Sequence, residues 1–274
     1  MKEMINLDNG NKICKVKVED LSILVISYDG AEELWKPFSQ AWNQKWSDCP
    51  FETILTTQNT SNLSDSCFDR IVSVPSKATQ AIYRIKETLK QIQSKYVLIM
   101  CDDYFLYDRP NENILINIID MMREKKISCV HLDNKGKYTE ELEVNEIRNN
   151  SFLVSGGVPS IYERDFMDML CDKFLNCTMR EWELNASRWL EKEQYVIKNI
   201  VNSSFRCHHC VLEGYWRLQP YLWAKKNNFE LCFRTYKKPR ILHSIWAVGK
   251  AVCFNIVLKV FPKIYSKWSQ KKYS

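Results

Sequence analysis

Short apolar runs alternate with amphipathic stretches along the first half of the chain. Leu21–Ser27 and Tyr96–Cys101 are continuous apolar runs of strand length, as expected for strands buried on both faces of a sheet. Thr79–Lys95 carries its apolar residues at helical spacing, which predicts an amphipathic helix. With the weaker patterns, the order strand–helix–strand–strand–helix–strand predicts an α/β, Rossmann-like fold. Its central sheet should be mixed, mostly parallel and flanked by helices.

The weaker patterns predict further elements. Pro37 lies inside the first helical pattern, so we expect that helix to break or to begin late. Cys207–Gly214 is predicted to be a loop. The other expected strands are Phe51–Thr57, Asp69–Val74, Ser128–Leu132 and Tyr195–Phe205. The other expected helices are Ala31–Trp46, Asn113–Lys125, Phe166–Leu175, Met179–Gln194 and Tyr215–Lys226.

Two adjacent carboxylates, Asp102 and Asp103, follow the central apolar strand directly. Acids at the end of a buried strand are costly unless a cation neutralises them. The carboxyl ends of strands are also where open α/β sheets bind ligands. We therefore expect a divalent cation, Mn²⁺ or Mg²⁺, that joins this pair to a substrate phosphate. The alternative is that Asp102 caps the next turn while Asp103 is solvated.

The first strand ends in Ser27, Tyr28 and Asp29, which can present a carboxylate and an aromatic face to a nucleotide's base and ribose. Thr57, at the end of the second strand, is expected at the same nucleotide site. The alternative is that Tyr28, Asp29 and Gly30 form only a turn.

Two other segments are candidates for nucleotide-sugar contacts. Gly156 and Gly157 permit a close approach of the backbone to a ligand. Arg84, on the helix before the central strand, can reach phosphates, although a solvated helix face is the alternative.

Glu181, Trp182 and Glu183 begin a helix after a polar loop. Either acid could accept the proton of an acceptor hydroxyl, and the indole could form a platform for the acceptor's sugar ring. The alternative is that these acids only stabilise the helix, through the favourable interaction of a negative charge with the dipole at its N-terminus.

The cluster Cys207-His208-His209-Cys210 contains one CxxC pair without a second ligand pair at finger spacing, so it supports structural zinc poorly. His209 could instead be a third ligand of the metal at Asp103. A loop with incidental polar residues is the favoured alternative.

Composition excludes several classes. Glycine is scarce, with seven in 274 residues, and neither GxGxxG nor GxxxxGK[ST] occurs, so dinucleotide-binding and P-loop proteins lose their main support. The eleven cysteines are odd in number and irregularly spaced, which favours reduced thiols in a cytoplasmic protein. We expect no secretory signal and no membrane-spanning segment, because no suitable apolar run occurs.

The net charge is +6, and much of the excess lies after Arg234. We expect residues 1–240 to form the main domain and residues 241–274 a basic, amphipathic helical appendage. Such a segment can lie on an anionic membrane surface, or it can pack on the domain as an ordinary helix, with Pro262 as a kink or stop. The basic residues lack an aromatic-interleaved groove motif, so we expect no nucleic-acid partner.

Together, the motifs ISYDG, LWKPF, WNQKWSDCPFETILTTQN, AIYRIKETLKQIQSKYVLIMCDDYFL and REWELNAS resemble a family of bacterial glycosyltransferases with the GT-A fold. Members are encoded among capsule, lipopolysaccharide and other surface-polysaccharide genes. The resemblance covers roughly Leu21 to Leu231. It implies a nucleotide-diphosphate sugar donor, with UDP favoured, and a saccharide or lipid-linked acceptor.

The resemblance also implies roles for individual residues. The family's DXD-like metal motif corresponds to Asp102 and Asp103, but Tyr104 replaces the second acid, so Asp103 is the expected direct ligand. The family's Trp-Glu-Phe-Glu-type stretch appears with Glu183 as its first acid and Asn185 in place of its second. Glu183 is therefore the expected base. By a loose analogy with glycosidases, a single acid favours inversion.

These patterns predict a cytoplasmic GT-A-like glycosyltransferase, peripheral at the inner face of the membrane if the basic segment binds there. One rival is a nucleotidyltransferase, although a basic Gly-rich loop is missing after the first strand, where Glu32 and Glu33 stand. Another rival is a catalytically degenerate protein that binds sugar or acts as a scaffold.

Overall fold

The computed structural model describes residues 20–59, 66–132, 144–146, 153–200 and 205–239. The chain forms two compact units, residues 1–208 and 209–274. The predicted boundary at residue 240 and the amphipathic helix of residues 241–274 fall at or beyond the end of the described residues, so both stay predictions.

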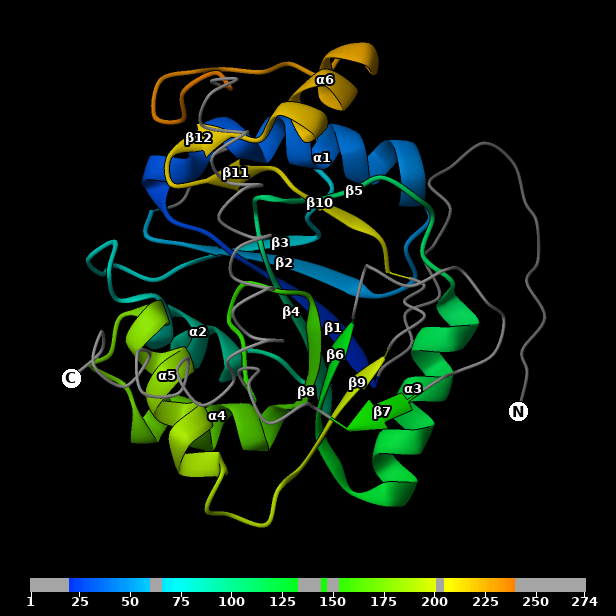
Figure 1. The fold of residues 1–274 in the computed structure, drawn as a ribbon, viewed down its shortest axis with the longest axis vertical. Coiled ribbons are helices and arrows are strands. Elements are labelled where there is room, and N and C mark those ends of the chain that lie inside the picture. The colour runs from blue at the N-terminus through cyan, green and yellow to red at the C-terminus, as the bar shows by residue number, and fades with distance from the viewer. Residues whose placement is uncertain (1–19, 60–65, 133–143, 147–152, 201–204, 240–274) are drawn as a thin grey trace, which may run out of the picture. The chain divides into compact units, whose positions relative to one another are not determined.

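The first unit is built on an eight-stranded sheet with the order β3-β2-β1-β4-β8-β6-β9-β7 (Figure 1). Strands β3, β2, β1 and β4 run parallel, β8 is antiparallel to both β4 and β6, β6 and β9 are parallel, and β7 is antiparallel to β9. The predicted mixed, mostly parallel sheet is confirmed. The strands are β1 Leu21–Ile26, β2 Glu52–Thr57, β3 Arg70–Ser73, β4 Tyr96–Cys101, β6 Ile127–Leu132, β7 Val144–Glu146, β8 Ser160–Glu163 and β9 Val196–Ile200.

Helices flank this sheet, as the amphipathic patterns predict. Apolar residues of α2, α4 and α5 share one core with one face of the central strands, and α3 contacts β6. Figure 1 shows α2, α4 and α5 grouped together and α3 on the other side of the strands. The helices of this unit are the 3-10 turn η1 Asp29–Ala31, α1 Glu32–Trp46, α2 Ala81–Leu89, α3 Glu112–Lys125, α4 Arg164–Lys173 and α5 Met179–Leu190.

The strand register brings three strand ends to one edge of the sheet. Ile26, the last residue of β1, is opposite both Thr56 of β2 and Cys101 of β4. The alignment continues past the strands, because Asp102 N donates to Ile26 O at 3.2 Å and Ser27 N donates to Thr56 O at 3.0 Å. The residues that follow these strands are therefore neighbours, although up to 75 positions separate them in sequence.

Helix α1 differs from its prediction. It runs unbroken through Pro37. A proline at this position removes one hydrogen bond, to the carbonyl of Glu33 in the first turn. The helix is held by burial instead, since Trp35, Trp42 and Trp46 are all almost inaccessible to solvent. The stabilisation from burying this aromatic face outweighs the cost of the hydrogen bond that Pro37 removes.

Two short strand pairings were not predicted. Strand β5, Tyr104–Leu106, directly follows the acidic pair and pairs with β10, Cys207–His209, inside the segment predicted as a loop. In the second unit, β11 (Val211–Leu212) pairs with β12 (Tyr215–Trp216). The predicted helix from Tyr215 therefore starts later, as α6, Leu218–Lys226. Runs of two or three residues are too short to show a period.

In the described part of the chain, no disulfide joins the cysteines. None of the helices described there is both long and apolar enough to cross a membrane.

Candidate functional site

The ends of β1 and β4 are joined by a buried side-chain hydrogen bond. Ser27 Oγ donates to Asp102 Oδ2, and Trp35 Nε1 of α1 donates to Ser27 Oγ at 2.6 Å. Asp102 is only 6% exposed, whereas Asp103 is half-buried. Asp102 therefore anchors the turn, and Asp103 is the more accessible member of the pair.

The burial of Asp102 has an electrostatic consequence. Desolvation and, second, the negative charge of Asp103 raise the pKa of Asp102 to about 8, although the hydrogen bond from Ser27 opposes this. Two carboxylates in this position repel each other, and a cation beside them would remove the repulsion.

Adjacent carboxylates are ligands that Mg²⁺ and Mn²⁺ accept. Among the residues that the structure describes, no three His, Cys, Asp or Glu side chains gather into a metal-binding cluster. The donor set at Asp103 and Asp102 thus fits a cation that takes its remaining ligands from a bound diphosphate and from water. His209 belongs to the second unit, and its role as a third ligand stays a prediction.

Asp29 connects the end of β1 to the end of β2. Its Oδ1 accepts hydrogen bonds from Thr57 Oγ1 at 2.9 Å and from the amides of Gln58 and Asn59 at 3.2 and 3.1 Å. Asn59 Nδ2 donates to Oδ2. Desolvation alone would raise the pKa of Asp29, but these hydrogen bonds outweigh it and hold the pKa below its ordinary value. The carboxylate is therefore ionised and fixed in place.

The side chain of Tyr28 folds back over the turn that follows β1. A Cβ atom at Gly30 would overlap Cε2 of the Tyr28 ring. Glycine thus allows the half-buried ring to lie against the backbone. The turn alternative and the ligand-binding interpretation are compatible here, because the same turn holds an aromatic face at the strand end.

Arg84 does not lie on a solvated helix face, as the alternative to phosphate binding supposed. It is 1% exposed, and its guanidinium donates to Lys77 O at 2.8 Å, Ala78 O at 3.2 Å and Ser76 Oγ at 3.2 Å. Burial lowers the pKa of Arg84, and the charge of Asp29 partly opposes this. In this structure Arg84 holds the loop before α2.

The two glycines are bonded to the last residue of β4. Cys101 N donates to Gly157 O at 3.3 Å, and Cys101 Sγ lies 3.5 Å from Gly156 O. The loop therefore lies directly beside the strand that carries Asp102 and Asp103.

Glu183 of α5 is held by the same loop. Its Oε1 accepts hydrogen bonds from Ser155 Oγ at 2.9 Å and from Gly156 N at 3.2 Å. Its Oε2 lies 3.3 Å from Arg180 Nη1, and its side chain is 14% exposed. One carboxylate oxygen is thus fixed by the loop, while the other faces an exposed arginine.

Three of the predicted acids act on the thiol of Cys101. Burial and then the negative charges of Asp103, Asp102 and Glu183 raise the pKa of the Cys101 thiol well above its ordinary value. The structure therefore brings together the acidic pair of β4 and the acid of α5, about eighty positions apart in sequence.

The other two residues of the Glu181–Glu183 stretch serve the helix. Glu181 and Thr178 form a capping box, in which Glu181 Oε2 accepts from Thr178 N at 2.8 Å and Thr178 Oγ1 accepts from Glu181 N at 3.3 Å. Trp182 is 0% exposed and packs in the core that α5 shares with α2 and α4. The platform expected at Trp182 is wrong, because its indole is covered by protein.

The predicted residues thus divide by accessibility. Some are buried beneath the strand ends: Ser27, Thr57, Arg84 and Asp102. Others are half-buried at its surface: Tyr28, Asp29, Asp103, Gly157 and Glu183. Sequence reasoning missed Asn59, Cys101 and Ser155. Their positions in the sequence could have identified them, because each adjoins a predicted strand end or the glycine pair.

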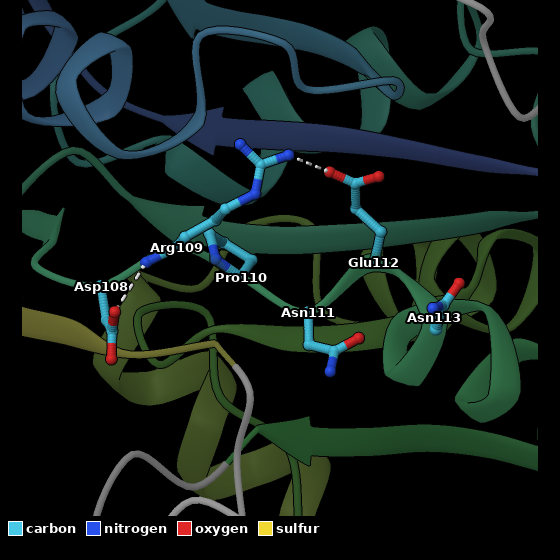
Figure 2. Close-up of a pocket in the computed structure, with 6 residues that line it drawn as sticks. All are labelled: Asp108, Arg109, Pro110, Asn111, Glu112 and Asn113. Carbon is cyan, nitrogen blue, oxygen red and sulfur yellow. Dashed lines mark hydrogen bonds and ion pairs between the residues drawn. The ribbon is translucent and has the colours of Figure 1, made fainter. Parts of the chain in front are cut away.

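A pocket of about 570 Å³ lies elsewhere, at the connection from β5 to α3, and is lined by residues 108–113 (Figure 2). Its arginine, Arg109, already bonds Glu112 at 3.0 Å and Asp48 at 2.8 Å. Asn111 caps α3 by accepting a hydrogen bond from Ile114 N at 3.3 Å. These polar groups serve internal bonds, so we place the candidate site at the strand ends.

We expect Gly156→Ala to destabilise the protein and Gly157→Ala to leave it nearly unchanged. A Cβ at position 156 would overlap Sδ of Met179 and lie 2.7 Å from its Cε, whereas a Cβ at 157 would lie 3.7 Å from Cys101 Sγ. Met179 is half-buried and the flexible end of its side chain can shift, so we expect a cost near the lower end, about 1 kcal/mol, of the range for overpacking, while a tolerated change stays within about 0.5 kcal/mol. Urea unfolding of both variants measures this difference, and equal losses would contradict it.

No protein-family model matches the sequence, and no curated protein does either. Three solved structures illustrate its structural likeness. TarS 1-349 of S. aureus is 13% identical, with a TM-score of 0.46 over 68% of this chain and 59% of that chain. A cytidylyltransferase from Leptospira borgpetersenii is 12% identical, with a TM-score of 0.42 over 69% and 81%. The mannosyltransferase PcManGT from Pyrobaculum calidifontis, in complex with GDP-Man and Mn²⁺, is 9% identical, with a TM-score of 0.41 over 71% and 58%.

The chain thus spans about three fifths of TarS 1-349. Likeness at these identities and TM-scores does not bear on chemistry.

Proposed function

We propose that the protein is a GT-A-like glycosyltransferase, which moves a sugar from a nucleotide-diphosphate donor, with UDP favoured, to a saccharide or lipid-linked acceptor. One observation carries the proposal. The pair Asp102–Asp103 at the end of β4 is connected through Cys101 and the Gly156–Gly157 loop to the carboxylate of Glu183. Two acids that could hold a cation with a phosphate, and a carboxylate that could act as a base, thus lie at one edge of the sheet, where α/β folds bind ligands.

The donor's nucleotide would lie against the ends of β1 and β2. Tyr28 offers its ring to the base, and Asp29, already fixed by Thr57, Gln58 and Asn59, offers Oδ2 to a ribose hydroxyl. Asp103, with Asp102 behind it, would hold a divalent cation. Bound there, the cation would act as a Lewis acid towards the diphosphate of the donor.

Glu183 would act as the base. Oε2 takes the proton of an acceptor hydroxyl while that oxygen forms a bond to the anomeric carbon. The bond from this carbon to the diphosphate breaks on the opposite face, its electron pair leaves with the diphosphate, and the configuration inverts. Ser155 Oγ and Gly156 N keep Oε1 in place during the transfer. Arg180 must move away from Oε2 to admit the acceptor.

The product and place of the reaction are proposed from the sequence resemblance. The transfer would serve cell-surface polysaccharide synthesis, on the cytoplasmic side of the membrane. The basic segment of residues 241–274 would hold the protein at an anionic membrane surface.

A thermal-shift panel of nucleotide diphosphates and nucleotide sugars, with and without Mn²⁺, tests the donor site. A ligand at about 100 times its Kd adds about 2.7 kcal/mol to the stability of the wild type. We expect one diphosphate to give this shift in the presence of Mn²⁺, and Asp103→Ala to abolish it. Asp108→Ala is the matched control, because Asp108 is an exposed acid that bonds Arg206.

The same panel, together with an assay of pyrophosphate release from nucleoside triphosphates, separates the rival functions. If no nucleotide stabilises the wild type, the transferase is excluded and a scaffold is favoured. If a nucleoside triphosphate is consumed with release of pyrophosphate, the protein is a nucleotidyltransferase.

A further inference from the structure

His131 is a buried histidine whose ring contacts both sides of the segment that holds Gly156 and Gly157, residues 153–159, called here the glycine loop. It lies on β6, is 9% exposed, and is opposite Ser160 of β8. Its Nε2 is 3.0 Å from Leu153 O, where the loop begins, and its Nδ1 is 2.7 Å from Ser160 Oγ, just after the loop ends. Ser160 Oγ is also 2.9 Å from the carbonyl oxygen of Val158.

The available protons limit how these contacts can be made. Leu153 O can only accept, so Nε2 of His131 carries a hydrogen. In the neutral ring, Nδ1 is then an acceptor, and the one hydroxyl proton of Ser160 must point to it. In the charged ring, Nδ1 donates to Ser160 Oγ, and the hydroxyl proton turns to Val158 O. The protonation state of the ring therefore decides whether the hydroxyl bonds the carbonyl of Val158.

This loop positions the base of the proposed reaction. Ser155 Oγ accepts from the amides of Gly157 and Val158, at 3.3 and 3.2 Å, and donates to Glu183 Oε1. Gly156 N donates to the same oxygen. The Ser155 hydroxyl thus connects the amide of Val158 to the carboxylate of Glu183.

We propose that His131 is a positioning residue, which sets the Gly156–Gly157 loop, and through it the Glu183 carboxylate, according to its own protonation. The loop effect stands on the contacts alone, whereas the effect on transfer rests on the proposed function.

The neutral ring is the form expected at neutral pH. Burial lowers the pKa of His131, and the bond to Leu153 O only partly opposes this. Cys129, two positions away on β6, and its opposite residue Tyr162 on β8 share this face of the sheet. Both are neutral, because burial raises the pKa of each. Glu183 of α5 and Asp168 of α4 are acids on helices that pack on this side, and Lys198 of β9 is opposite Val130, on the other face.

Nuclear magnetic resonance tests the loop effect without any activity. The chain holds seven glycines and four histidines, so ¹⁵N-glycine and ¹⁵N-histidine labelling gives few signals. We expect His131 as the Nε2–H tautomer, and the amide signals of Gly156 and Gly157 to shift with pH at the same midpoint as its ring. Ser160→Ala should abolish that shift of the glycine signals while the ring still titrates. The proposal would be overturned if the glycine signals did not change as His131 titrates, or if His131 were the Nδ1–H tautomer.

Kinetics test the effect on transfer. His131→Gln keeps a donor for Leu153 O but cannot titrate near neutral pH. We expect its kcat to fall about 10- to 100-fold, as for a misplaced catalytic group, with the donor KM unchanged. The acid decline of kcat that coincides with the titration of His131 should disappear. His208→Gln is the control, because His208 lies on β10 and stacks on Tyr107.

The two experiments can contradict the loop effect and the proposed function independently of each other. If the glycine signals follow His131 but the wild type transfers no sugar, the proposed function is wrong and the loop effect stands. If transfer is present and His131→Gln keeps the wild-type pH profile, the effect on transfer is wrong.

Discussion

We expect the replacement of Glu183 by Gln to lower the rate of the proposed sugar transfer about 10²–10⁴-fold, the usual contribution of a general base, while the nucleotide-diphosphate donor still binds. The amide keeps the size of the side chain, and its oxygen can still accept from Ser155 Oγ and Gly156 N, so the loop stays in place. It cannot take the acceptor's proton. The release of nucleotide diphosphate in the presence of acceptor measures the rate, and the thermal shift measures donor binding.

Glu181→Gln is the matched control for this prediction. It makes the same change two residues earlier on the same helix, and glutamine at this position preserves the capping box with Thr178. We expect its rate to equal that of the wild type. A Glu183→Gln enzyme that retains full activity would show that another group takes the proton, and a loss of donor binding would assign Glu183 to the donor site instead.

Trp182→Ala lowers the free energy of unfolding by about 3–5 kcal/mol, the range for removing a buried tryptophan. The side chain is 0% exposed and lies among residues of α2, α4 and α5, so its removal leaves a cavity that the surrounding helices fill only partly. Such a loss is a large share of the stability of a typical domain. Urea unfolding measures it.

Trp189→Ala, on the same helix, is the comparison for Trp182. Trp189 is half-buried and contacts Phe174, Tyr195 and the amino group of Lys173. Its truncation should cost clearly less, because part of its surface is already in water. If Trp182→Ala instead kept its stability and raised only the acceptor KM, the indole would be an acceptor platform after all.

The division between buried and accessible residues explains why sequence patterns predicted which residues follow the strand ends but not which of them are buried. The pattern places Ser27, Asp102 and Glu183 at the ends of elements, where functional groups lie. It does not reveal that Asp102 faces Ser27 in the interior, or that Arg84 bonds only neighbouring loop groups in the contacts described above. Such contacts depend on which strands are neighbours.

The sequence by itself determined the strands β1 and β4, the amphipathic helix α2, the strand-end acids and the order of elements that makes an α/β sheet. These follow from local periodicity, because burial of a strand or a helix face requires a fixed spacing of apolar residues. The tertiary structure alone decided that β8 enters the sheet antiparallel between β4 and β6. That insertion brings the Gly156–Gly157 loop to Cys101, and with it Glu183 and His131. Its physical reason is long-range pairing: backbone hydrogen bonds between distant strands leave no period in the residues that make them.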